Sequence, residues 1–321
     1  MRACAPDRHV LPGKALLRTS LRLLLKPVLG PRVPIALQRR WVDAVTALGP
    51  SAKRLSLASQ TMNGVPAECV RADGADSGRV ILFLHGGGYC VGSPRSHRAL
   101  AGQLAFRAAA CVYAPDYRLA PEHPCPAALD DALSAYRWLL ARDVAAGSIV
   151  LVGDSAGGGL ALSLALALRN RGQPLPAALV LLSPWVDLGL SGASQRTHAA
   201  RDPMLSMAGL QRWSAAYRAT LAADDPVCSP LYANLRGLPP LLIQVGSEEV
   251  LLDDARRLQQ RAQAAGVDVQ LQEYAGLWHD FQLQAGLVAE AGIAIAAIAR
   301  FIDGRCALPP GAIPFVAGGV A

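Results

Sequence analysis

The sequence predicts an α/β fold with a mostly parallel central sheet flanked by helices. Short apolar runs of strand length alternate along the chain with segments of helical character, which is typical of parallel strands joined by right-handed helical crossovers. The runs 80–84 and 178–182 are apolar at every position, as expected of central strands that are buried on both faces. The length of 321 residues suits one large domain with an insertion, or two small domains.

The alternation can be followed from about residue 66 to residue 303. Strands are expected at about 66–71, 79–84, 110–115, 148–153, 178–182, 240–245 and 268–273. Helices are expected at about 95–109, 126–142, 156–171, 251–265 and 284–303.

The alternation stops between about residues 184 and 238, where the only regular element expected is a helix at 203–221. An insertion of this length after a strand is a candidate lid or cap. We expect the N-terminal segment to join it. The predicted division is an N-terminal part of a helical cap (1–50), a first catalytic part (51–183), a cap insertion (184–238), a second catalytic part (239–305) and a loose tail rich in Pro and Gly (306–321).

Charge and cysteine content limit the classes of partner. The net charge is +7, but residues 1–54 hold 11 Lys or Arg and 2 acidic residues, whereas the remainder holds 20 basic and 22 acidic residues. Because the body is nearly neutral, we expect no nucleic-acid partner. The seven cysteines are widely spaced without a Cys-x-x-Cys pair, which predicts reduced thiols in a cytoplasmic protein rather than disulfides or a zinc site.

Residues 15–29 are apolar with Arg18, Arg22 and Lys26 at every fourth position, so these charges fall on one face of a helix. The charges interrupt the segment too often for a membrane span, and no signal-peptide cleavage pattern follows it. We expect an amphipathic helix that covers part of its own protein. A membrane-surface anchor is the alternative.

The most informative motif is Gly-Asp-Ser-Ala-Gly at 153–157, which follows an apolar run and opens an expected helix. Strand, Gly-x-Ser-x-Gly and helix is the context of a nucleophile elbow. A serine there lies on a strained turn, and the glycines Gly153 and Gly157 let the turn close and a substrate carbonyl approach. Ser155 is therefore a candidate nucleophile.

A second motif, His-Gly-Gly-Gly-Tyr at 85–89, follows the expected strand 79–84. Three consecutive glycines expose backbone N–H groups that no side chain obstructs. Acyl transfer needs such donors where negative charge develops on the tetrahedral oxygen, and the N–H of Ala156 would add another. A phosphate-binding loop is the alternative, but the segment contains neither Gly-x-Gly-x-x-Gly nor a P-loop.

Two later segments could supply the partners of the serine. Four carboxylates follow the expected strand 240–245, and one of them could orient a histidine. The residues alone leave the choice open, because a helix N-terminus explains most of them. His279, which follows the last expected strand, is the only histidine after this acidic loop. The order serine, acid, histidine is that of α/β-hydrolases.

Together these segments resemble the hormone-sensitive-lipase-like family of carboxylesterases. Its two signatures correspond to His-Gly-Gly-Gly at 85–88 and Gly-Asp-Ser-Ala-Gly-Gly at 153–158, and the segment 116–124 also resembles the family. The similarity extends from about residue 60 to residue 303. It implies an α/β-hydrolase fold with a helical cap.

The resemblance also implies roles for individual residues. It makes Ser155 the nucleophile, His279 the base and Glu249 the acid. Most relatives carry Asp at the acid position, so the longer Glu249 is a departure, and Glu248 or Asp253 remain alternatives. The implied oxyanion donors are the backbone amides of Gly87, Gly88 and Ala156.

Other residues are expected to support the site. Arg118, Glu122 and Asp154 could tie the glycine loop in place through charge-assisted hydrogen bonds. Apolar side chains could line an acyl or alcohol pocket, with simple packing of the cap as the alternative for each. These are Tyr89, Trp185, Met204, Met207, Leu210, Trp213 and Tyr217.

The sequence therefore predicts a serine carboxylesterase that acts on short- to medium-chain acyl esters through an acyl-enzyme. The expected partner is a small-molecule ester, and the family resemblance implies no metal or cofactor. The same residues would also serve an acyltransferase, an amidase or a lactonase. A hydrolase fold that binds a ligand without catalysis is a further alternative.

Overall fold

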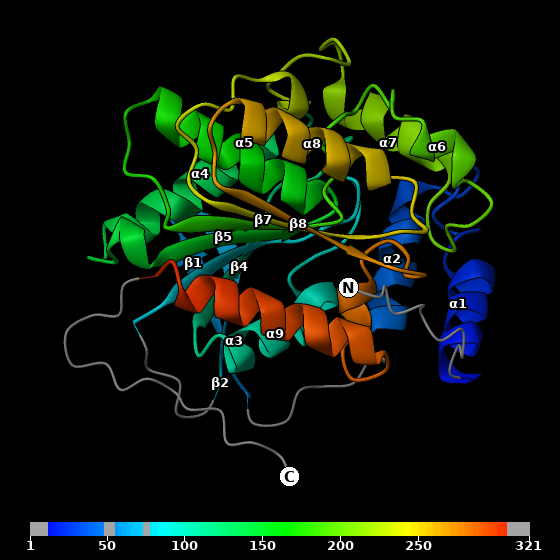
Figure 1. The fold of residues 1–321 in the computed structure, drawn as a ribbon, viewed down its shortest axis with the longest axis horizontal. Coiled ribbons are helices and arrows are strands. Elements are labelled where there is room, and N and C mark those ends of the chain that lie inside the picture. Colours follow the sequence, from blue (N-terminus) through cyan, green and yellow to red (C-terminus); the bar gives the residue numbers. More distant parts are fainter. Residues whose placement is uncertain (1–11, 48–54, 73–77, 307–321) are drawn as a thin grey trace, which may run out of the picture.

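An eight-stranded sheet forms the centre of the computed structural model, which describes residues 12–47, 55–72 and 78–306 (Figure 1). The strand order is β1-β2-β4-β3-β5-β6-β7-β8. Strands β1 and β2 are antiparallel to their neighbours, and the remaining pairs are parallel. The strands are β1 (Leu55–Met62), β2 (Val65–Ala72), β3 (Val80–Leu84), β4 (Cys111–Pro115), β5 (Ile149–Asp154), β6 (Ala178–Leu182), β7 (Leu241–Gly246) and β8 (Val269–Tyr274).

Helices cover both faces of the sheet, with α4, α5 and α8 on one side and α3 and α9 on the other (Figure 1). Helices α1, α2, α6 and α7 lie together at one end of the molecule. This arrangement confirms the predicted α/β class. The helices are α1 (Pro12–Leu24), α2 (Ile35–Ala47), α3 (Arg98–Arg107), α4 (Ala127–Leu140), α5 (Ala156–Asn170), α6 (Ser194–Thr197), α7 (Met207–Arg218), α8 (Leu252–Ala264) and α9 (Ala289–Asp303), with 3₁₀ turns η1 (Arg95–His97), η2 (Ala146–Ser148), η3 (Pro230–Tyr232) and η4 (Phe281–Gln284).

The central strands β3, β5, β6 and β7 are buried at every position, as their largely apolar sequences predict, and the polar exceptions are Asp154 and Gln244. The edge strand β1 was not predicted, and the reason is its sequence. Its residues Leu-Ser-Leu-Ala-Ser-Gln-Thr-Met are nearly all exposed, so they need not follow an apolar pattern. Helix α9 also begins five residues later than expected, because η4 ends at Gln284 and a turn with Gly286 at φ 93° precedes the helix.

The basic residues of α1 and of the turn that follows it contact the protein itself. Arg22 and Lys26 donate hydrogen bonds to the backbone oxygens of Ala200 and Ala199, at distances of 2.5 and 2.9 Å. The opposite side of this helix carries exposed leucines, Leu16 at 69% and Leu23 at 67% exposure. The amphipathic helix therefore covers part of its own protein, as expected. Among the described residues, no helix is both long and apolar enough to cross a lipid bilayer.

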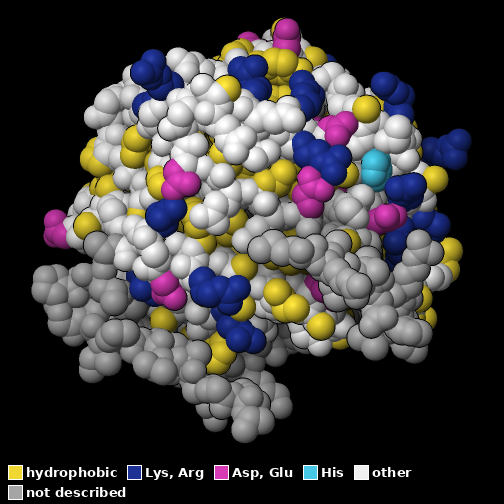
Figure 2. Space-filling view, in the orientation of Figure 1, with side chains coloured by type: hydrophobic (Ala, Val, Ile, Leu, Met, Phe, Trp, Pro, Cys, Tyr) yellow, Lys and Arg dark blue, Asp and Glu magenta, His cyan; other side chains and the backbone are white. Residues whose placement is uncertain are grey.

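Charged side chains of both signs are interspersed over the face of the molecule drawn in Figure 2. This mixture agrees with the nearly neutral charge of the chain after residue 54. The division into cap and catalytic parts stays a prediction. The predicted tail lies outside the described residues except for Cys306.

Candidate active site

The pairing of strands brings the two glycine-containing motifs together. Strands β3 and β5 are parallel neighbours, and Leu84 lies opposite Gly153 in their register. The residues that follow each strand therefore emerge side by side at the carboxyl edge of the sheet. In this way the tertiary structure places the serine turn beside the glycine loop at 85–89.

Ser155 lies on a strained turn between β5 and α5. Its backbone has φ 51° and ψ −120°, a combination that non-glycine residues rarely adopt. The turn is held by two backbone hydrogen bonds, from Ser155 N to Leu182 O at 2.8 Å and from Trp185 N to Ser155 O at 2.9 Å. A Cβ atom at Gly157 would lie 1.9 Å from Leu84 O, so this position has no room for a side chain.

The glycine loop adopts conformations that favour glycine. Gly87 has φ 116° and Gly88 has φ 60°. A Cβ atom at Gly88 would lie 2.3 Å from a ring carbon of Trp213 on α7. The loop is anchored where Gly86 N donates to Asp154 Oδ1 at 3.0 Å and where the Tyr117 hydroxyl donates to His85 O at 2.6 Å.

His279 connects the serine to one carboxylate. Its Nε2 lies 3.0 Å from Ser155 Oγ, and its Nδ1 lies 2.7 Å from Glu249 Oε2. The other oxygen of Glu249 accepts a hydrogen bond from Gly246 N at 2.9 Å, which orients the carboxylate. The side chains of His279 and Glu249 are 2% and 0% exposed, so water scarcely screens their interaction.

The remaining acidic side chains of this loop have other partners. Glu248 forms an ion pair with Arg18 at 3.3 Å. Asp253 accepts a hydrogen bond from Ser194 N, and Asp254 accepts one from Asp187 N. Of the four candidates, the structure thus brings only Glu249 to the histidine.

Burial and charge shift the pKa values of this group of residues. Burial raises the pKa of Glu249, although the hydrogen bond from His279 opposes the shift. Burial alone would lower the pKa of His279, but Asp280 first and Glu249 second outweigh it and raise that pKa well above its usual value. The site therefore favours a charged imidazole, which is the state that follows proton transfer from a serine.

Only one of the three expected supporting residues contacts the glycine loop directly. Asp154 ties the glycine loop directly, as expected, but Arg118 instead binds Asp131 with Nη2–Oδ1 at 2.7 Å. Glu122 acts through a residue that the sequence did not single out. It pairs with Arg39 of α2, whose Nε donates to Cys90 O at 2.8 Å. Nothing in the sequence near Arg39 indicated this long-range contact.

Most of the predicted pocket residues are buried. Tyr89 stacks on Tyr217 with ring centroids 3.7 Å apart, and Trp185 is fully buried. Trp213 reaches the glycine loop, and its Nε1 donates to Gln38 Oε1 at 3.0 Å. Trp213 therefore has the most direct contact with the predicted oxyanion loop. Met204 and Leu210 are also buried, whereas Met207 is half-buried.

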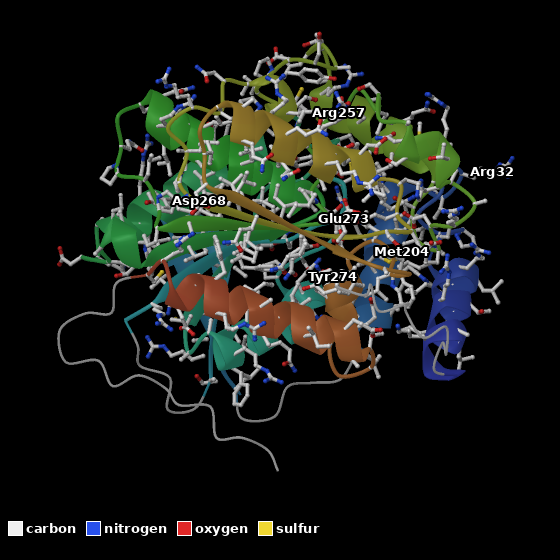
Figure 3. All side chains as sticks on the ribbon, in the orientation of Figure 1. Arg32, Met204, Arg257, Asp268, Glu273 and Tyr274 are labelled. Carbon is white, nitrogen blue, oxygen red and sulfur yellow. The ribbon has the colours of Figure 1, made fainter. Side chains whose placement is uncertain are left out.

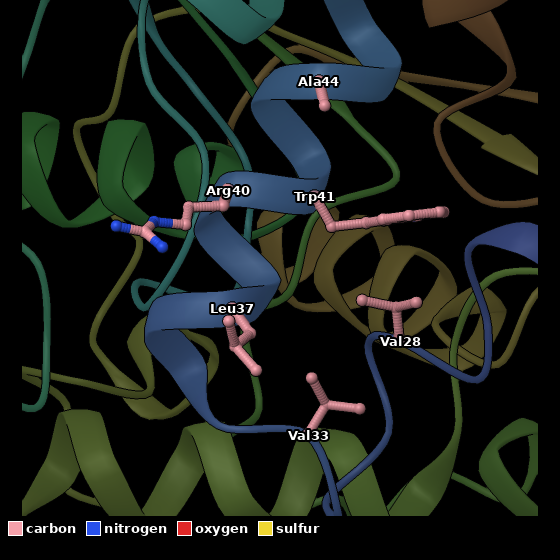
Figure 4. A pocket seen from close by; sticks show the side chains of 6 residues that line it. All are labelled: Val28, Val33, Leu37, Arg40, Trp41 and Ala44. Atoms are coloured by element: carbon pink, nitrogen blue, oxygen red, sulfur yellow. The ribbon is translucent and has the colours of Figure 1, made fainter.

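A separate apolar hollow of about 330 Å³ lies beside α2 and the segment that joins it to α1 (Figure 4). It contains none of the predicted site residues, and it is lined by Val28, Val33, Leu37, Arg40, Trp41 and Ala44. Among the described residues, no group of three or more His, Cys, Asp or Glu side chains is arranged to hold a metal ion.

Comparison with known proteins identifies the family. A family model described as the alpha/beta hydrolase fold matches residues 81–283. The chain belongs to this α/β-hydrolase family. It is 47% identical over 242 residues to an acetyl-hydrolase of Streptomyces hygroscopicus, covering 75% of this chain and 81% of that protein. It is 38% identical over 289 residues to an esterase of Acinetobacter venetianus, covering 90% and 92% of the two chains.

Solved structures narrow the assignment within the α/β-hydrolases. An esterase from the bacterial hormone-sensitive lipase family has a TM-score of 0.89 and 41% identity, covering 95% of this chain and all of that one. A hormone-sensitive lipase from a metagenome library has a TM-score of 0.85 and 42% identity, covering 90% and 97%. The predicted resemblance is thus confirmed, and the protein is a carboxylic ester hydrolase of this family.

Proposed function

We propose that the protein is a serine carboxylesterase that hydrolyses short- to medium-chain acyl esters through an acyl-enzyme. The observation that carries the proposal is the position of His279, with one ring nitrogen 3.0 Å from Ser155 Oγ and the other 2.7 Å from Glu249. A hydroxyl becomes a strong nucleophile when a histidine held in this way can accept its proton.

In the acylation step, Ser155 Oγ attacks the ester carbonyl carbon while its proton passes to His279 Nε2. Glu249 accepts the hydrogen bond from Nδ1–H and stabilises the imidazolium. The alcohol then leaves with the proton from Nε2, which forms the acyl-enzyme. In deacylation, water gives a proton to the same nitrogen and attacks the acyl carbon, and Ser155 recovers its proton when the acid departs.

Backbone amides stabilise the oxyanion of each tetrahedral intermediate. We assign this role to the N–H groups of Gly87, Gly88 and Ala156, because both glycines follow β3 and Ala156 begins α5 beside them. One such donor contributes about 3–4 kcal/mol to transition-state stabilisation. The strained turn at Ser155 and the left-handed conformations of the two glycines keep the donors in place before the substrate arrives.

The cap supports a preference for short acyl groups. The indole of Trp213 lies against Gly88, so a substrate that reaches the oxyanion loop must fit beside a large rigid ring. The similarity to an acetyl-hydrolase of Streptomyces hygroscopicus supports a short acyl group. We therefore propose that turnover is fastest on esters of short to medium acyl length.

The direct test is the Ser155→Ala variant, assayed with a short p-nitrophenyl ester and with a fluorophosphonate probe. We expect kcat to fall by about a millionfold, with only the residual rate that the oxyanion donors and binding provide, and labelling to disappear. Ser163→Ala is the matched control, because it removes a hydroxyl from α5, the helix that follows Ser155. Full activity of Ser155→Ala would refute the proposal. Product analysis with an added alcohol separates hydrolysis from acyl transfer.

A further inference from the structure

A second carboxyl group lies at the catalytic side of the histidine. The Oδ2 atom of Asp280 is 3.0 Å from His279 Nε2, the same nitrogen that faces Ser155 Oγ at 3.0 Å. The Asp280 side chain is only 6% exposed. Its other oxygen, Oδ1, is buried without a hydrogen-bond partner in the described part of the chain. Ser155 Oγ and Asp280 Oδ2 therefore both lie at hydrogen-bond distance from the same ring nitrogen, Nε2 of His279.

The backbone fixes this position of the carboxyl group. Asp280 has φ 50° and ψ 38°, in the left-handed region where aspartate is enriched among non-glycine residues. Its N–H donates to Ser183 Oγ at 3.2 Å, and its carbonyl accepts from Leu283 N at 3.0 Å. Because contacts on both sides hold the turn, the side chain is directed at Nε2.

The contact requires a proton. When His279 is neutral and donates from Nδ1 to Glu249, its Nε2 is an acceptor without a hydrogen. A carboxylate oxygen is also only an acceptor, so the two atoms would repel at 3.0 Å. The contact is favourable in two states: a protonated Asp280 that donates to Nε2, or an imidazolium that donates to an ionised Asp280.

The other titratable groups around this pair come from several elements. Glu249, after β7, faces Nδ1, and Asp202 of the cap acts electrostatically on Glu249. On the other side, Asp154 at the end of β5 acts on Asp280, and its Oδ2 lies 3.2 Å from Nε2 of His97 in η1. Asp280 also acts electrostatically on His97, and His97 acts in turn on His85 of the glycine loop.

We propose that Asp280 sets the pH at which His279 becomes a free base, by holding one proton with His279 in competition with the Ser155 hydroxyl. The inference depends on the proposed function, because it assumes that His279 is the base for Ser155. In this role Asp280 is a positioning residue that acts through the histidine and does not touch the ester.

The electrostatics of the site agree with this role. Burial raises the pKa of Asp280 to about 7, and Asp154 adds to the shift while His279 opposes it. Asp280 makes the largest contribution to raising the pKa of His279 against the effect of burial. An anion beside a base stabilises the protonated base, so the free base, and with it activity, is lost as the pH falls through this raised pKa.

The test uses Asp280→Asn and Asp280→Ala, which both remove the negative charge. The measured quantities are kcat/KM for a short p-nitrophenyl ester and the rate of Ser155 phosphonylation, each from about pH 5 to pH 9. We expect the acid limb of both profiles to move to lower pH by about one to two units in each variant. Glu273→Gln is the matched control, since Glu273 of β8 pairs with Arg256 and its variant should keep the wild-type profile (Figure 3).

Two results would overturn the inference. If activity fell equally at every pH and the acid limb stayed in place, Asp280 would have a structural role only. If the limb did not move although activity was retained, another group would set the protonation of His279. In both cases the probe would still phosphonylate Ser155. If the probe did not label the wild-type protein at all, the proposed function itself would be refuted.

Discussion

The carboxyl edge of the sheet and the predicted cap, which includes helices α1, α2, α6 and α7, are held by different kinds of interaction. The serine turn and the glycine loop follow fully buried strands, and glycines there meet backbone atoms at distances that exclude any side chain. The cap is joined largely by long cationic side chains that donate to backbone oxygens. Lys26 donates to Asp202 O at 2.6 Å, and Arg212 of α7 donates to Val33 O at 2.6 Å.

Because of this difference, we infer that the sheet edge governs the chemical step and that the cap governs access of the substrate. Atoms at the sheet edge are fixed by strand register and backbone contacts, so a change there moves a reacting group. Each of these charged hydrogen bonds contributes about 1.5–3 kcal/mol and none involves a reacting group, so a change there alters how the cap lies over the site. We therefore expect large losses of kcat at the sheet edge and smaller changes in substrate preference or KM in the cap.

The largest effect is expected at the acid of the proposed triad. The contrast between the sheet edge and the cap would be refuted if this acid could be replaced without loss of activity. Glu249→Gln keeps the shape of the side chain but removes the charge that orients and stabilises the imidazolium, so kcat should fall about a thousandfold or more. Steady-state kinetics with a short ester provide the measurement. Glu248→Gln, which loses only the pairing with Arg18, should stay within about twofold of the wild type, since exposed ion pairs contribute little. A reversed order of effects would assign the acid to Glu248.

The glycine loop should show the next largest effect. In Gly88→Ala the new Cβ meets the ring of Trp213, and the positive φ is unfavourable for alanine, so the N–H shifts away from the oxyanion. Loss of one donor predicts a fall in kcat of about a hundredfold. Gly147→Ala is the control because its Cβ would have no neighbour within 4 Å. An unchanged kcat in a folded Gly88→Ala protein would remove this loop from the mechanism.

Substitution of a cap residue should alter the preference between acyl-chain lengths but not the rate on the best substrate. Trp213→Leu removes part of the ring that lies against Gly88, so the ratio of kcat/KM for octanoate to that for acetate should rise about tenfold. Competition assays with p-nitrophenyl esters measure this ratio. Trp138→Leu changes a tryptophan of α4 that packs on Tyr113, and its ratio should stay that of the wild type. If both variants behaved alike, Trp213 would have no part in acyl selection.

The smallest effect is expected at the contact between α1 and the cap loop. Lys26→Met keeps the length of the side chain but loses the hydrogen bonds to Ala199 O and Asp202 O, so KM should rise about twofold to threefold with kcat unchanged. Arg32→Met at an exposed position should leave both constants unchanged (Figure 3). A large fall in kcat for Lys26→Met would show that the cap is as tightly coupled to the chemistry as the sheet edge.

The sequence determined the fold class and the positions of Ser155 and His279. Uniformly apolar strands, a Gly-x-Ser-x-Gly turn and a histidine after the last strand are local patterns, and parallel strands bring their carboxyl ends to one edge. The strand β1 was not predicted, because an exposed edge strand need not have an apolar pattern.

Only the tertiary structure decided which side chains meet at that edge. Four carboxylates stand within a few residues of each other, but a hydrogen bond from Gly246 and the long-range partners of the other three leave Glu249 beside His279. The second carboxyl group, Asp280, follows the histidine directly in sequence, yet its contact with Nε2 depends on a left-handed turn held by Ser183. Local sequence limits backbone conformation, whereas the direction of a buried polar side chain depends on partners that come from distant parts of the chain.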